Sequence, residues 1–352
     1  MHARSSTTAA VPGRALLLGR LVAGLPVIGV AALAGWGLSL LTTRVENWFV
    51  MTDELYYQRL AISVAQTGSL LPRLQGEVVS NLNQLYPVLL STVYGHGDVP
   101  ASFDSAHRLN AYVMASAAIP VYLLARKLGV GRVLGLAAAA LSVVVPWMVL
   151  ASFLLTEVVA YPAFCWAVLA LVHATARKTA LADLLAVGAL VLAVTARAQF
   201  FVLALVLALA VATEALLEQR ERGLSGRPLL RAAASSLARR RLLIGAFLAG
   251  VVALVVAAIS GEAGDLLGSY AVTAEGIHVD GETLRLVLEQ WGVLVLATGL
   301  VPLIVGSAWI VDRLRPAADS VQRGFGVVAA WAVVAVLLQV ASFNQRFGAG
   351  LV

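Results

Sequence analysis

Cysteine and charged residues are both scarce in this chain of 352 residues. The single cysteine, Cys165, lies within an apolar run, so an internal disulfide is excluded and the redox compartment cannot be read from it. Only 12% of the residues are charged, whereas about a quarter are charged in a typical soluble domain. This scarcity excludes an ordinary soluble globular protein.

The chain instead contains long runs of apolar residues. Hydrophobic residues make up 60% of the chain, and the mean hydropathy is +0.89. Runs of about 20 apolar residues are long enough to cross a hydrocarbon core about 30 Å thick. The sequence therefore predicts an all-α polytopic membrane protein with about nine transmembrane helices. The expected spans are residues 15–43, 108–125, 133–152, 157–176, 180–197, 199–217, 242–259, 292–311 and 324–343.

The first apolar run has two interpretations, a secretory signal peptide or an uncleaved first helix. Its apolar stretch from Leu21 to Leu41 is longer than the usual 7–15-residue core of a signal peptide, and no small-residue cleavage site precedes Arg44. We favour the uncleaved helix. Residues 1–14 are then a cytoplasmic N-terminal segment, and residues 15–352 form the membrane domain.

Basic residues predict the orientation of the chain. With a cytoplasmic N-terminus, alternation of the nine spans puts 18 of the 25 Lys and Arg residues on the cytoplasmic side, which is the bias that membrane proteins show. Topology thus accounts for the net charge of +6, and a nucleic-acid partner is not expected. The Arg-rich, Lys-poor composition favours a bacterial chain in the cell membrane.

Two longer segments, residues 44–107 and 260–291, are expected on the extracytoplasmic side. In the first, larger apolar residues recur every four positions from Tyr56 to Val64, which predicts a short amphipathic helix in the membrane interface. A Gly-rich turn and an extended piece follow, and Pro87 predicts the start of a second short helix. The second segment is acidic and carries His278, expected to be exposed to solvent.

Isolated charges in apolar surroundings are the most informative residues. Glu157 is the only side chain ionised at neutral pH in residues 133–176, and Arg197 is the only one in residues 184–213. Ionisable groups at membrane depth are costly and point to functional sites. The alternative is that both merely cap turns or pair with each other to fix helix packing. The candidate residues expected at the outer membrane boundary are Asp53, Glu54, Arg108, Glu157 and Arg197.

Five segments occur in a characteristic order: TDELYYQRLAISVAQTG, LYPVLLSTVYG, HRLNAYVMASAAIPVYLLARKLG, TEVVAYP and TARAQF. Together with the first apolar run, they resemble the GT-C membrane glycosyltransferases, a group that contains protein O-mannosyltransferases and the lipid A aminoarabinose transferase. The resemblance covers roughly residues 15–215 and is weaker beyond them. The sequence ends nine residues after the ninth expected span, so we expect either a short member or a fragment of a longer chain.

The resemblance implies transfer of a sugar from a polyprenyl-phosphate donor to an acceptor hydroxyl on the extracytoplasmic face. Asp53 matches the family's catalytic carboxylate in the first outer loop, with Glu54 beside it. A hydroxyl attacks an anomeric carbon poorly unless a base accepts its proton. Arg108 and Arg197 are the candidates for binding the donor phosphate. Glu157 matches an outer acidic position that would orient the donor sugar, or hold a divalent cation with Asp53.

Several alternatives stay open at this point. Asp53 or Thr52 could cap the first interfacial helix, and Arg108 could extend to the headgroups without binding a substrate. The metal requirement, the sugar and the acceptor, which could be a lipid, a polysaccharide or a protein, are not readable. A secondary transporter would be expected to show inverted repeats and charges near the midplane. A non-catalytic membrane subunit is the remaining alternative.

Overall fold

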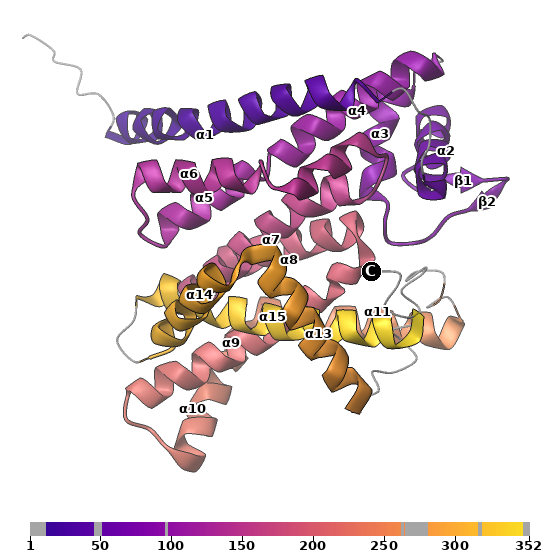
Figure 1. Cartoon of the computed structure of the whole chain (residues 1–352). Helices are drawn as coiled ribbons and strands as arrows, with labels where there is room; N and C mark the ends of the chain where they lie inside the picture. The colour runs from indigo at the N-terminus through magenta and orange to yellow at the C-terminus, as the bar shows by residue number, and fades with distance from the viewer. Residues whose placement is uncertain are drawn as a thin grey trace, which may run out of the picture.

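The computed structural model describes residues 12–45, 51–95, 98–261, 264, 281–315 and 319–347. Its helices up to the middle of the chain are α1 (Pro12–Thr42), α2 (Thr52–Thr67), α3 (Leu85–Tyr94), α4 (Val99–Ala115), α5 (Ala118–Lys127), α6 (Arg132–Ser142), α7 (Glu157–Arg177) and α8 (Ala180–Ala196). The later helices are α9 (Val202–Glu221), α10 (Gly226–Ala238), α11 (Arg241–Ser260), α13 (Gly281–Thr298), α14 (Leu300–Arg313) and α15 (Ser320–Phe347). The structure also contains two 3₁₀ helices, η1 (Pro146–Ser152) and η2 (Ala198–Phe201), and two short strands, β1 (Arg73–Leu74) and β2 (Glu77–Val78) (Figure 1).

The predicted all-α membrane architecture agrees with these helices. Within the described residues, six helical segments are long and apolar enough to cross a membrane, or eight if each of two bent pairs is one span. The six are Gly24–Thr42, Pro100–Lys127, Glu157–Arg177, Ala198–Glu221, Arg241–Ser260 and Ser320–Gln345. The expected span at 180–197 corresponds to α8, a shorter apolar helix of 17 residues. The number nine therefore stays a prediction.

Two of the expected spans are not straight helices, which corrects the sequence-based prediction. The span expected at 133–152 divides into α6 and η1, which meet at 53°, and Pro146 begins the second part. Proline lacks an amide donor and disfavours helical backbone in the residue before it. The span expected at 292–311 divides into α13 and α14, which meet at 109° around Gly299. Gly299 has a φ of +83°, a conformation that glycine adopts without strain.

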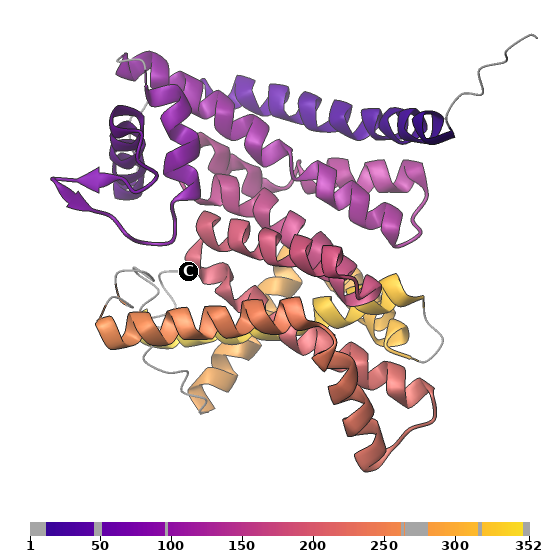
Figure 2. The ribbon, with the colours of Figure 1, turned by 180° about the vertical axis from the view of Figure 1, so that it is seen from behind.

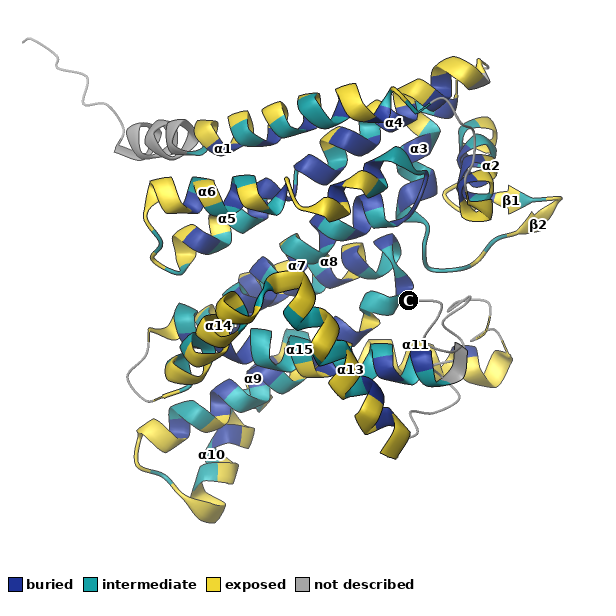
Figure 3. Ribbon diagram, viewed as in Figure 1, coloured by how far each residue is buried: buried dark blue, intermediate teal, exposed yellow. Residues whose placement is uncertain are grey.

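Helix α7 lies at the centre of the bundle. Of its most apolar window, 61% is buried, compared with 17% for α1 and 6% for α11. Buried positions accordingly gather on α7 and its neighbours, while exposed positions cover much of the outlying helices (Figure 3). In a bilayer, exposed apolar side chains such as Leu33, Val252 and Leu296 would face lipid chains rather than water.

The bundle has two ends, each defined by contacts between segments far apart in the sequence. At the first, the amide of Leu154 contacts Glu54, and the side chain of Gln339 contacts Gln199. At the second, Gln322 contacts Leu128, and Arg323 contacts Glu214. We call these the α2 end and the α10 end. The 21 residues of α7 run between them, a length of about 30 Å.

The first expected outer loop forms a compact unit at the α2 end. Helix α2 lies across the direction of α1 and α4, with the β1–β2 hairpin beside it (Figure 1). Helix α2 is capped at its C-terminus by Gly68, which has a φ of +67° and whose amide donates a hydrogen bond to the carbonyl of Val64 at 2.9 Å. The two short helices expected in this segment are thus confirmed as α2 and α3, and their position in the membrane interface stays a prediction. Residues 265–280, which include His278, lie outside the described part.

Candidate functional site

Asp53 occupies the first turn of α2 and is exposed. The N-cap of α2 is Met51, whose own side chain forms no capping hydrogen bond, so the alternative that Thr52 or Asp53 supplies the cap is wrong. In the part of the chain that the structure describes, the carboxylate of Asp53 forms no hydrogen bond or ion pair. A carboxylate at a helix N-terminus is stabilised there by the helix dipole. Asp53 thus combines an accessible charge with a fixed backbone.

In contrast to the exposed Asp53, Glu54 is buried and only 2% exposed. Its Oε1 accepts a hydrogen bond from the amide of Met51 at 3.0 Å, which closes the start of α2. Its Oε2 accepts one from the amide of Leu154 at 3.1 Å, just ahead of α7. Glu54 therefore joins the first turn of α2 to the segment that leads into α7.

Glu157 and Arg197 form an ion pair at the same end of the bundle. The reason is local: α7 and α8 are antiparallel, because Lys178 takes a left-handed conformation (φ +53°) and Thr179 caps the next helix. Glu157 begins α7 and Arg197 follows the last residue of α8, so the antiparallel hairpin brings the two charged side chains together. Both side chains keep some exposure, 18% for Glu157 and 23% for Arg197.

Tyr57 shows how these charges lie relative to Asp53. Burial raises the pKa of Tyr57 well above its ordinary value, and the negative charge of Asp53 raises it further. A hydrogen bond with the Thr156 side chain and the charge of Arg197 lower this pKa, while Glu157 raises it. Since such effects weaken with distance, the hydroxyl of Tyr57 lies within electrostatic range of all three charges. We call Asp53, Glu157 and Arg197 the α2-end cluster.

Asparagine side chains hold the surroundings of this cluster in place. The Oδ1 of Asn83 accepts a hydrogen bond from the amide of Ala198 at 2.6 Å, which fixes the loop before α3 beside Arg197. The amide of Asn81 donates to the hydroxyl of Tyr56 at 3.1 Å. Asn110 of α4 accepts from Tyr86 at 3.0 Å. Sequence reasoning missed these asparagines; the repeated Asn in SNLNQLYP ahead of α3 was a signal for Asn81 and Asn83, and Asn110 had none.

Arg108 does not join the cluster. It is an exposed residue of α4, and it has no hydrogen bond or ion pair with any residue that the structure describes. Its neighbour His107 is fully buried, with its ring 4.3 Å from that of Phe103. Of the predicted phosphate-binding arginines, only Arg197 forms an ion pair with a candidate carboxylate, Glu157, among the described residues.

The cluster offers few ligands for a metal ion. No group of three or more His, Cys, Asp or Glu side chains that could hold a metal occurs among the described residues. Asp53 and Glu157 are the two carboxylates that the sequence suggested for a divalent cation, and Glu157 is already paired with Arg197. The geometry therefore provides at most an incomplete ligand set from these side chains.

Comparisons of this chain with protein-family models, curated proteins and solved structures find no match. The interpretation of the site therefore depends on its own residues and on the order of segments in the sequence.

Proposed function

We propose that this protein is an integral-membrane glycosyltransferase that transfers a sugar from a polyprenyl-phosphate donor to an acceptor hydroxyl. The observation that supports this proposal best is the α2-end cluster. Its exposed carboxylate and its half-buried ion pair come from segments more than 100 residues apart, yet all three charges act on the hydroxyl of Tyr57. The cluster lies where α7 begins, at the rim of a candidate membrane span.

In the proposed reaction, Asp53 is the general base. The acceptor oxygen forms a bond to the anomeric carbon of the sugar, and its proton moves to the Asp53 carboxylate. The bond between that carbon and the phosphate oxygen breaks, and its electron pair stays on the departing polyprenyl phosphate. Asp53 suits this role because its side chain is accessible, whereas Glu54 is buried and bonded to two backbone amides. We therefore propose Glu54 as a positioning residue.

Arg197 is proposed to bind the donor phosphate as its negative charge grows. A guanidinium has five N–H donors in a fixed plane, and it can bond phosphate oxygens in pairs. Its ion pair with Glu157 fixes the direction of this plane and leaves 23% of the side chain exposed. Glu157 is proposed to orient Arg197 and to contact the hydroxyls of the sugar.

The placement of charge favours this function over a secondary transporter. Transporters bind substrates and ions near the midplane of the bilayer. In α7, the central helix, ionisable carboxylate and guanidinium groups occur only at its two ends, Glu157 and Arg177. A lipid-linked donor needs a reactive site at headgroup height, and the location of Glu157 at the first residue of a candidate span supports this placement.

The proposal is tested by the substitution Asp53→Asn. Membranes that contain the protein are incubated with labelled polyprenyl-phosphate sugars, and transfer of label to endogenous acceptors is measured. Loss of a general base costs about 10²–10⁴-fold in rate, so transfer by Asp53→Asn should fall by at least that lower amount. Asp104→Asn is the matched control, because Asp104 is an exposed residue of α4 that lies outside the cluster. Equal transfer by both variants would remove Asp53 from the mechanism.

A further inference from the structure

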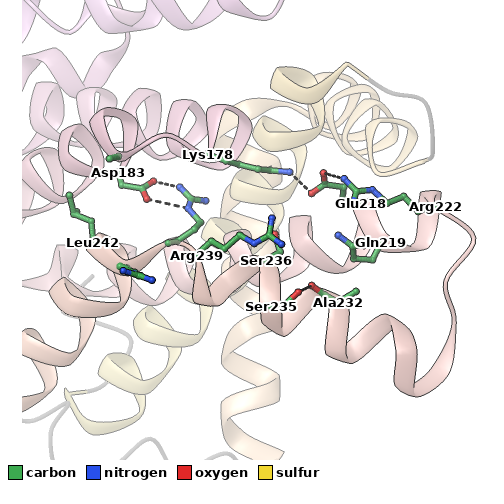
Figure 4. A pocket seen from close by; sticks show the side chains of 13 residues that line it. Lys178, Asp183, Glu218, Gln219, Arg222, Ala232, Ser235, Ser236, Arg239 and Leu242 are labelled. Carbon is green, nitrogen blue, oxygen red and sulfur yellow. Dashed lines mark hydrogen bonds and ion pairs between the residues drawn. The ribbon is translucent and has the colours of Figure 1, made fainter.

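A second site of concentrated charge lies at the α10 end, far from the α2-end cluster. A cavity of about 600 Å³ opens where the turn after α7, the end of α9, the helix α10 and the start of α11 meet. Figure 4 shows Lys178 pointing toward Glu218, with Arg239 between Lys178 and Ser236. Figure 2 shows the corner between α10 and α11 from behind.

The lining of this cavity carries a surplus of positive charge. Its charged residues are five cations, Lys178, Arg222, Arg239, Arg240 and Arg241, and two carboxylates, Asp183 and Glu218. Lys178 bonds Glu218 at 2.6 Å, and Glu218 in turn bonds Arg222 at 2.9 Å. Arg240 is buried and bonded to both oxygens of Asp183 and to the carbonyl of Ala174. These pairs satisfy both carboxylates.

Two of the cations have no such partner. Arg239 and Arg241 flank the buried Arg240, both are exposed, and neither has a hydrogen bond or ion pair among the described residues. The buried pair of Arg240 with Asp183 fixes the backbone between them. The cavity thus presents two available guanidinium groups and the hydroxyls of Ser235 and Ser236.

The position of the cavity indicates the source of its ligand. Three candidate spans end or begin at it: Glu157–Arg177 ends beside Lys178, Ala198–Glu221 ends beside Arg222, and Arg241–Ser260 begins there. The cavity therefore lies at the height of lipid headgroups. Next to it, α11 is apolar and only 6% buried, with Leu248 and Val252 more than half exposed. Acyl chains could lie along this face while a phosphate occupied the cavity.

We propose that this cavity binds the phosphate headgroup of an anionic phospholipid. The phosphate accepts hydrogen bonds from Arg239 and Arg241, as guanidinium groups bind phosphate oxygens. The acyl chains follow the exposed face of α11. Helix α10 lies next to the cavity, with Arg227 and Arg231 exposed and Leu230 also exposed, the composition of a helix that lies on an anionic membrane surface. This site is independent of the proposed transferase reaction.

The test measures lipid binding to the purified full-length chain in detergent. Native mass spectrometry and lipid-dependent thermal unfolding are recorded with phosphatidylglycerol, with zwitterionic phosphatidylcholine, and with inorganic phosphate alone. Each basic residue near an anionic surface contributes enough to change affinity about fivefold. The double variant Arg239→Gln with Arg241→Gln should therefore bind phosphatidylglycerol at least tenfold more weakly than the wild type. Each single substitution should have a smaller effect in the same direction.

The matched control is Arg227→Gln with Arg231→Gln, which removes the same charge from exposed positions of α10 that do not line the cavity. Because neither residue lines the cavity, this control should weaken phosphatidylglycerol binding much less than the cavity variant does. Equal weakening by the two double variants would show general surface attraction and overturn the site. Equal binding of the two lipids, or binding of inorganic phosphate alone with the same dependence on Arg239 and Arg241, would overturn the assignment to a phospholipid.

Discussion

At the residue scale, Asp53 and Glu54 show how adjacent carboxylates can have different roles. Sequence reasoning could select both, together with the isolated charges Glu157 and Arg197. It could not separate the two carboxylates, because the second backbone partner of Glu54 is Leu154, 100 positions away in the chain. It also included Arg108, which has no hydrogen bond or ion pair with the cluster residues in the described part of the chain, so its role stays a prediction. Distances between charges depend on helix packing, which the composition of apolar runs does not encode.

Glu54→Gln is expected to destabilise the protein. The amide of glutamine keeps one acceptor oxygen but turns an NH₂ group toward one of the two backbone amides that Glu54 now binds. A buried donor without an acceptor costs about 1–3 kcal/mol. Thermal unfolding in detergent should show a lower midpoint for this variant. Glu77→Gln, on the exposed strand β2, is the control and should unfold as the wild type does; an unchanged midpoint for Glu54→Gln would contradict the positioning role.

At the element scale, α2 and α3 pack through tyrosine rings. The ring of Tyr57 lies 5.8 Å from that of Tyr86 and 5.3 Å from that of Tyr56, in edge-to-face arrangements. The hydroxyl of Tyr86 is buried and bonded to Asn110 of α4. This packing attaches the first expected outer loop to the bundle at the end where Glu157 and Arg197 form their ion pair.

The tyrosine packing predicts a loss of stability at alkaline pH. Burial raises the pKa values of Tyr56, Tyr57 and Tyr86, and it raises that of Tyr94 to about 12. The unfolded chain loses these protons near pH 10 while the folded protein keeps them, so stability falls as the pH rises above about 10. Thermal midpoints measured from pH 8 to 11 should fall less steeply for Tyr57→Phe than for the wild type. Parallel profiles would show that Tyr57 does not keep its proton.

Some of the helices could be predicted from the sequence, whereas the bends between them could not. The α7–α8 hairpin, α2 and the helix at Pro87 follow from periodicity and from turn residues. The bends at Pro146 and Gly299 were missed, because the apolar runs continue through them and hydropathy does not report backbone direction. A proline or glycine within an apolar run marks a place where a helix can break, and only packing decides whether it does.

At the scale of the whole molecule, charge is divided between two ends that the central helix α7 separates. The α2 end holds Asp53 with the Glu157–Arg197 pair, and the α10 end holds a basic cavity and the ion pairs of Arg240 and Arg323. In a bilayer this division places the two sets in opposite headgroup regions. The proposed reaction and the proposed lipid site thus belong to opposite faces of one membrane.

The most direct test of this account is labelling of introduced thiols in intact cells. Single cysteines replace Asp53, Asn83 or Arg239 in a Cys165→Ser background, and a membrane-impermeant maleimide is added before or after permeabilisation. Asn83 reports on the Glu157–Arg197 pair, because it contacts Ala198. The account predicts that positions 53 and 83 react in intact cells, whereas position 239 reacts only after permeabilisation. Labelling of positions 53 and 83 from opposite faces, or of positions 53 and 239 from the same face, would contradict it.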